Sequence, residues 1–304
     1  QILNYANNRF KLYKDISKAN IYKSIVGSVV QIITGFLKLG TTGLIIGQLT
    51  SQLISNSKLF FNIKNQLKNI DKNKIKNMSI RYINFPKYSL WAGLLNTLSV
   101  QILPILLGIF FKSTEVGAYF LVMRVISIPS SLVGASFSQV FFKEFSNENI
   151  FLSTNEKDLL LSTQKKLSIL SFIPFSFILV YGDTLFPFIF GKNWILAGSI
   201  SQYLSIWMYL VFIYSPISIT FDIIGKQKLS MIFQFIIFLV RVISIVLGYF
   251  LFKTFKNTIM LFSILSALLI FFMIYYINKQ IGIEIKSWIK IILLPFVFII
   301  ILFI

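Results

Sequence analysis

The chain has 304 residues, of which 56% are apolar and only 13% are charged, and its mean hydropathy is +0.79. A soluble domain carries about 25% charged residues, so this composition excludes an ordinary soluble globular fold. The net charge is +19, and the chain contains neither His nor Cys, which excludes disulfides and disfavours transition-metal and acid–base chemistry. We therefore expect no cofactor, no metal and no enzymatic activity.

Nine apolar segments follow one another along the chain, each near the length of about 20 residues that a helix needs to cross a bilayer. None alternates apolar and polar residues as a strand would, and helices satisfy their own backbone in lipid. The sequence predicts an all-α integral membrane protein with about nine transmembrane helices, the fifth of which breaks near Gly182 and Asp183. The nine segments are 21–40, 42–62, 88–111, 117–142, 167–190, 194–222, 229–252, 258–278 and 286–304.

Basic residues between these segments indicate the orientation. Residues 1–23, 58–87, 143–166, 223–228 and 279–290 together carry 22 Lys and Arg, and this alternation holds across all nine crossings. The positive-inside rule places these basic segments in the cytoplasm, and their position between apolar spans argues against a nucleic-acid-binding surface. The opposite side carries five lysines, which are Lys38, Lys112, Lys192, Lys253 and Lys256.

The longest basic segment, 64–87, separates two hydrophobic blocks and predicts a cytoplasmic linker between two helical lobes. On the outer side only residues 182–194 form a substantial loop, which is aromatic and interrupted by proline. We expect that loop to lie at the membrane interface or to re-enter the membrane. The chain opens at Gln1 without a signal-peptide pattern and stops within an apolar run, so we expect it to be a piece of a longer protein.

Arg241 lies at the middle of segment 229–252, where an arginine costs about 2.5–3.5 kcal/mol on insertion scales. Such a residue normally faces a polar interior or a water-filled cavity. Its neighbours at helical spacing support that placement, because small and polar residues fall on the same stripe of the helix. These neighbours are Ser230, Gln234, Ser244 and Gly248.

Two other segments carry similar stripes: Arg124 precedes Ser127, Ser131 and Ser138, and segment 21–40 carries Ser24, Ser28, Gln31, Gly35 and Lys38. Close helix packing would explain the Ser and Gly positions. The arginines instead favour a shared cationic cavity for an anionic substrate, because a guanidinium binds phosphate oxygens through a bidentate fork. The candidate substrate-binding residues are Arg124, Arg241, Gln31 and Gln234.

Asp222 is one of few acids near the spans, and two readings compete for it. It forms a local ion pair with Lys226 or Lys228, or it is a candidate site for a coupling ion. Nucleotide-binding, metalloprotease and hydrolase motifs are absent from the sequence, so ATP hydrolysis within this chain is unsupported. Four prolines inside spans predict bent helices, and these are Pro104, Pro129, Pro174 and Pro216.

Three stretches, at 81–121, 124–138 and 190–228, carry a resemblance to a known family. The first is similar to that family's linker and seventh helix with a VGxY turn, and the second, RVISIPSSLVGASFS, to its eighth helix. The third contains FGKNWILAG, a Ser-Pro within a helix and a Gly-Lys-Gln turn, and upstream NRFKLYKD and GLIIGQ also fit. The chain resembles the oligosaccharide flippases of polysaccharide biosynthesis, of the O-antigen translocase type within the MATE-like superfamily of exporters.

The resemblance implies a bundle of 12 to 14 helices in two lobes around a central cavity. On that map residues 1–63 are the last two helices of the first lobe, 64–87 the linker, 88–278 the second six-helix lobe and 279–304 the start of an additional C-terminal helix. The first four helices would precede this chain. Arg124 matches an arginine position of the family, whereas Arg241 belongs to no motif that we can match.

The implied activity is flipping of an undecaprenyl-pyrophosphate-linked oligosaccharide across the bacterial cytoplasmic membrane by alternating access. Its products would serve O-antigen of lipopolysaccharide, capsule or exopolysaccharide, with membrane lipids and other polysaccharide assembly proteins as partners. A multidrug exporter of the same superfamily is an alternative, although arginines suit cationic drugs poorly. A membrane polymerase or ligase would carry a large outer loop, and a purely structural subunit would not need two arginines within its spans.

Overall fold

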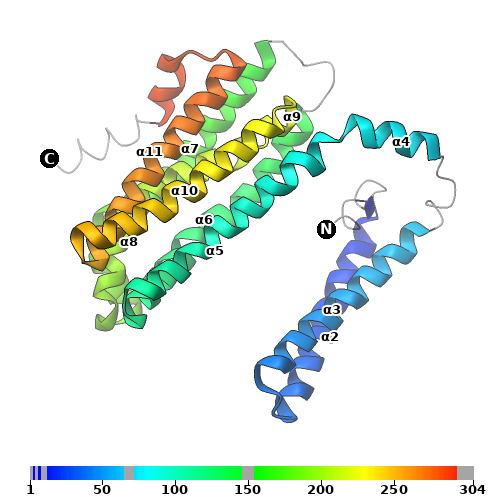
Figure 1. Ribbon diagram of the computed structural model, residues 1–304, viewed down its shortest axis with the longest axis horizontal. Coiled ribbons are helices and arrows are strands. Elements are labelled where there is room, and N and C mark those ends of the chain that lie inside the picture. Colours follow the sequence, from blue (N-terminus) through cyan, green and yellow to red (C-terminus); the bar gives the residue numbers. More distant parts are fainter. Residues whose placement is uncertain (1–2, 4–5, 8–11, 65–71, 146–153, 293–304) are drawn as a thin grey trace. The chain divides into compact units, whose positions relative to one another are not determined.

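The structure is a computed structural model that describes residues 3, 6–7, 12–64, 72–145 and 154–292, without the side chains of 13, 72, 74, 131–145 and 154–156 (Figure 1). Within these ranges every regular element is a helix, as the sequence predicts. The chain divides into two units, Gln1–Arg81 and Tyr82–Ile304, and the division falls inside the linker expected at 64–87.

The first unit contains a pair of 24-residue helices, α2 (Tyr13–Phe36) and α3 (Gly40–Ile63), followed by the short basic helix α4 (Lys72–Arg81). The face that α3 buries repeats every fourth residue and begins with small side chains, which lets two helix backbones approach closely. The buried residues of α3 are Gly43, Gly47, Ser51, Ser55, Leu59 and Ile63.

Helices α2 and α3 approach each other closely at Gly47. A Cβ atom added there would lie 2.5 Å from the Cγ of Gln31 and 3.3 Å from the carbonyl oxygen of Gly27, so a larger residue would push the helices apart. The stripe predicted on α2 is thus mostly outside the contact with α3. Its residues Ser24, Ser28, Gly35 and Lys38 are exposed, whereas Gly27 and Thr34 are buried.

The second unit places six long helices in sequence and adds short turns between them. Its elements are η2 (Phe85–Ser89), α5 (Leu90–Phe110), α6 (Ser113–Phe145), α7 (Thr154–Phe190), η3 (Lys192–Trp194), α8 (Ile195–Ile217), α9 (Thr220–Ile223), α10 (Gln227–Phe252) and α11 (Phe255–Ile281). Residues 285–292 are also helical. The four predicted prolines lie inside helices, and Pro187 is a fifth.

Helix α8 is the core of this unit and packs against α6, α7 and α11, while α10 packs against α5 and α11. The outer faces of these helices are apolar, as at Ile173, which is 71% exposed, and Ile109, which is 68% exposed. Soluble proteins rarely expose so much contiguous apolar surface, so these faces are suited to lipid. The chain is a multi-pass membrane protein.

Helix α7 corrects two predictions, because it continues without a break through Gly182 and Asp183 to Phe190. The expected outer loop 182–194 is thus largely helix, and the chain turns only at Gly191, whose φ is 97°. Gly182 instead marks the crossing of α7 with α8. A Cβ atom added at Gly198 of α8 would lie 2.6 Å from the carbonyl oxygen of Gly182, so both glycines serve close packing and not a break.

Five helical segments of the described residues have the length and composition of membrane spans, and they match five of the nine predicted segments. These five are Phe85–Phe110, Lys157–Phe190, Lys192–Ile223, Gln227–Phe252 and Phe255–Ile281. Segments 21–40, 42–62 and 117–142 form the long helices α2, α3 and α6, which are not among the five. Of segment 286–304, residues 293–304 lie outside the described part of the chain.

Buried hydrogen bonds join residues 285–292 to helices α7 and α8 of the second unit. The hydroxyl of Ser168 on α7 donates to the carbonyl oxygen of Ile291 at 2.8 Å, and the hydroxyl of Tyr209 on α8 donates to that of Ile292 at 2.9 Å. Trp288 is 1% exposed and lies 5.2 Å from the ring of Phe271 on α11. This segment therefore packs against the unit through its described residues.

Candidate functional site

Arg241 lies in the middle of α10, and the face that it shares with Ile237 and Ser244 is buried within the second unit. Its side chain is 9% exposed. The helix places it there because apolar residues at helical spacing turn the same face toward α5 and α11, against which α10 packs. The sequence prediction that Arg241 faces an interior and not lipid is consistent with this geometry.

Arg241 is held by two neighbouring helices. Its Nη1 atom donates a hydrogen bond of 2.8 Å to the hydroxyl of Ser99 on α5, and Ser99 is itself fully buried. Its Cζ atom lies 5.5 Å from the ring centroid of Trp207 on α8, within the range of a cation–π contact. These two contacts fix the guanidinium between α5 and α8.

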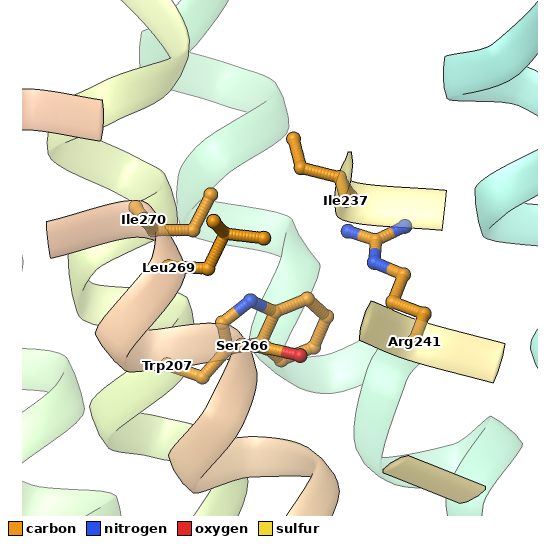
Figure 2. A pocket seen from close by; sticks show the side chains of 6 residues that line it. All are labelled: Trp207, Ile237, Arg241, Ser266, Leu269 and Ile270. Carbon is orange, nitrogen blue, oxygen red and sulfur yellow. The ribbon is translucent and has the colours of Figure 1, made fainter. Parts of the chain in front are cut away.

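The guanidinium borders a small cavity of about 10 Å³, roughly the space of one water molecule, between α8, α10 and α11. Figure 2 shows Arg241 and Ile237 on one side of this pocket, with Trp207, Ser266 and Leu269 on the other. Three buried polar atoms at the pocket have no hydrogen-bond partner in the described part of the chain: Nε of Arg241, Nε1 of Trp207 and Oγ of Ser266.

This arrangement leaves a buried positive charge uncompensated, since no carboxylate of the described residues pairs with Arg241. Moving an ion from water into a protein interior costs several kcal/mol of free energy. A well-placed anionic partner is needed to offset that cost. A guanidinium, an indole N–H and a hydroxyl can all donate to an acceptor. The pocket is therefore chemically suited to oxygen atoms that carry negative charge, such as those of a phosphoryl group.

The other described positions of the predicted stripe on α10 serve either helix packing or polar contacts. Gly248 allows α11 to approach, because a Cβ atom added there would lie 3.0 Å from the Cα of Thr258. Ser244 donates to the carbonyl oxygen of Arg241 at 2.9 Å and is fully buried. Gln234 is half-buried, and its Oε1 is without a partner among the described residues, so it remains a free polar group on this face.

Arg124 lies on α6 of the same unit, but it does not line the pocket beside Arg241. Its side chain is exposed on a face that it shares with the exposed apolar residues Phe120 and Ile128. An exposed arginine in a membrane helix needs water or another polar surface beside it. Ser127 donates to the carbonyl oxygen of Arg124 at 3.3 Å, while the side chains of Ser131 and Ser138 lie outside the described residues.

Gln31 belongs to the first unit, where it is half-buried and packs over Gly47 of α3. Asp222 on α9 does not form the ion pair that was the simpler prediction. Its carboxylate accepts a hydrogen bond of 3.2 Å from Ser89, whereas Nζ of Lys226 donates to Oε1 of Gln280. The turn between α9 and α10 carries Lys226 toward α11, which explains the difference.

Three residues around Arg241 were absent from the sequence prediction: Ser99, which accepts its hydrogen bond, and Trp207 and Ser266, which line its pocket. They lie on three different helices, far apart in the chain, and each reads as an ordinary packing residue within its own apolar segment. Only the tertiary arrangement of α5, α8 and α11 brings them to the guanidinium. The one available sequence signal is the spacing of Ser99, Leu103 and Leu107, which recur every fourth residue and so lie on one face of α5. All three are buried.

Comparisons with known proteins agree with this architecture. The sequence model of a family described as polysaccharide biosynthesis protein matches residues 2–199. A solved structure described as lipid II flippase MurJ, inward closed conformation, is similar with a TM-score of 0.60 and 18% sequence identity. The similarity covers 91% of this chain and 59% of that one, so this chain spans about three-fifths of the flippase. No curated protein sequence matches the chain.

Proposed function

We propose that this chain, which belongs to the polysaccharide biosynthesis protein family, takes part in moving a lipid-linked oligosaccharide across the bacterial cytoplasmic membrane. The carrier is undecaprenyl pyrophosphate, and the glycan serves O-antigen, capsule or exopolysaccharide. The fold likeness to a lipid II flippase supports transport and not enzymatic chemistry. In this proposal residues 1–63 and 88–278 belong to two lobes that rock about a linker at 64–87, with 279–304 beginning a further helix.

The observation that carries the proposal is the buried, uncompensated guanidinium of Arg241 inside a membrane-embedded unit. A charge in that position costs free energy unless an anion compensates it during the working cycle. A pyrophosphate is such an anion, and its glycan can stay in water while its prenyl chain stays in lipid. A cationic drug would be repelled by the same group.

We assign Arg124 and Arg241 to the pyrophosphate at different stages. Arg124 is exposed and can meet the headgroup directly, whereas Arg241 becomes accessible only when its small pocket opens between α8, α10 and α11. Gln234, with its unpartnered Oε1, and Gln31 would hydrogen-bond the headgroup or the sugar. Asp222, whose carboxylate accepts a hydrogen bond from Ser89, is the candidate site for a coupling ion.

The test uses the protein encoded by the complete gene, reconstituted in vesicles with a fluorescent undecaprenyl-pyrophosphate-linked oligosaccharide. Arg124→Ala and Arg241→Met should each abolish movement of the probe between leaflets while insertion into vesicles stays normal. Lys192→Gln, which removes an exposed positive charge outside both sites, is the matched control and should transport at the normal rate. Normal transport by both arginine variants would contradict the assigned roles.

A further inference from the structure

The second unit holds another pocket, of about 590 Å³, at the end where α5 joins α6 and α10 joins α11. These two turns lie at the same end of the unit in Figure 1. By the positive-inside rule this end faces away from the cytoplasm. The exposed side chain of Ile109 lines the pocket, so the pocket lies next to the apolar surface that we assign to lipid.

Positive charge gathers at this pocket although the outer side carries little of it. Of the five outer lysines, Lys112, Lys253 and Lys256 line it, and all three are exposed. No carboxylate of the described residues forms an ion pair with them. Glu115 also lines the pocket, but its Oε2 accepts the backbone N–H of Lys112 at 2.9 Å, which caps the start of α6. The lining thus keeps a net positive charge.

Lys253 is the residue at which helix α10 ends. Its φ is 54°, in the left-handed region, where it ends helix α10. Glycine normally occupies this position at a helix C-terminus, because a side chain there costs of order 1 kcal/mol. This turn brings Lys253 to the lining of the pocket.

Stacked aromatic rings build the wall beside the lysines. Phe110 stacks on Tyr249 with centroids 4.6 Å apart, and Phe111 meets Tyr249 at 5.4 Å and Phe255 at 5.2 Å, edge to face. These contacts link α5, α10 and α11, so the wall is fixed by three helices. It offers a rigid apolar surface directly beside positive charges.

We propose that this pocket binds the pyrophosphate end of a prenyl lipid at the outer leaflet, with phosphoryl oxygens at the lysines and the first isoprene units on the aromatic wall. The proposal rests on the proposed function, because that function delivers such a headgroup to this side of the membrane. The pocket would hold the translocated carrier before its release, at a place distinct from Arg241. Ammonium groups suit this task, since they bind phosphate as mobile point charges.

The test is photo-crosslinking of the full protein in nanodiscs with a benzophenone-bearing geranyl pyrophosphate, mapped by mass spectrometry. Labelling should appear in residues 109–112 and 249–256. In a triple variant, Lys112→Gln, Lys253→Asn and Lys256→Gln, labelling there should fall about tenfold, which corresponds to the loss of about 1.4 kcal/mol of binding. Asparagine is chosen at Lys253 because it tolerates the left-handed backbone. Lys192→Gln is the control at the same side and should label normally.

Unchanged labelling in the triple variant would contradict the proposed binding site. It would also be contradicted if dihexanoyl phosphatidylglycerol reduced labelling as strongly as unlabelled geranyl pyrophosphate does. The second result would identify a general headgroup surface. Failure of the proposed function looks different: the lysines would still govern labelling, while the wild-type protein would not move lipid-linked oligosaccharide between leaflets. A Tyr249→Leu variant, which removes the stacked ring and no charge, should also weaken labelling.

Discussion

At the scale of single residues, the burial of Arg241 costs free energy that its described contacts only partly offset. Its burial removes the guanidinium from water, while Ser99 and Trp207 return only one hydrogen bond and one cation–π contact. Replacing a poorly compensated buried charge by an apolar side chain of similar size is often neutral or stabilising, by about 1–4 kcal/mol. Stability and transport should therefore respond to this residue in opposite directions.

We predict that Arg241→Met leaves thermal stability in detergent unchanged or raises it, while transport is lost. Thermal unfolding monitored by tryptophan fluorescence gives the stability, and the vesicle assay gives the rate. Arg241→Lys keeps the charge and is the companion variant; it should retain more transport than Arg241→Met. A clear fall in melting temperature for Arg241→Met would mean that the residue holds the lobe together and does not serve a substrate.

Ser99 provides a second residue-scale prediction. Its hydroxyl is the described hydrogen-bond partner of the Arg241 Nη1 atom, so Ser99→Ala leaves a buried charged donor unsatisfied. We expect a destabilisation of about 1–3 kcal/mol. The double variant Ser99→Ala with Arg241→Met should recover most of this loss, because it removes both partners. Additive losses in denaturant titrations of the four proteins would argue against the coupling.

At the scale of elements, close helix crossings rest on glycine. A Cβ atom at Gly198 would lie 2.8 Å from the Cα of Asp183, so α7 must move away from α8. We predict that Gly198→Ala costs about 1–3 kcal/mol through overpacking. Gly108→Ala in α5 is the matched control, since no atom lies within 4 Å of its added Cβ, and it should be neutral or slightly stabilising. Equal melting temperatures for the two variants would contradict the crossing.

The element that follows α11 gives a further prediction. Tyr209→Phe removes the hydroxyl that contacts both Ser168 and the carbonyl oxygen of Ile292. Hydrogen exchange of residues 285–292 should become faster, while exchange in α10 stays as in the wild-type protein. Tyr203→Phe on the same helix is the control. Unchanged protection of 285–292 would show that the contacts of Trp288 suffice to hold this segment.

The helices are the part of the fold that the sequence predicts best. Apolar length and the alternation of basic loops were enough to place the helices, because the bilayer imposes both. The break predicted at Gly182 was wrong, since one glycine can end a helix or admit a neighbour, and only the position of Gly198 decides which. For the same reason Arg241 could be found from its apolar surroundings, whereas Ser99 and Trp207 could not.

At the scale of the whole molecule, the described part of the second unit presents apolar faces outward and buries Arg241, which pairs with no carboxylate of that part. A soluble domain has the opposite distribution, with apolar side chains inside and charged side chains on the surface. The observed distribution fits a transporter that must shield a charged headgroup from lipid. The chain belongs to the polysaccharide biosynthesis protein family, and its fold is similar to that of a lipid II flippase. Transport of a lipid-linked glycan is thus the central claim.

The most direct measurement deletes the gene that encodes this chain in its host and assays the undecaprenyl-linked oligosaccharide on each leaflet of the cytoplasmic membrane. The account predicts accumulation on the cytoplasmic leaflet together with loss of surface glycan. Delivery to the outer leaflet at the normal level, with units left unpolymerised or unattached, would contradict it and point to an enzyme instead. No change on either leaflet would equally contradict it.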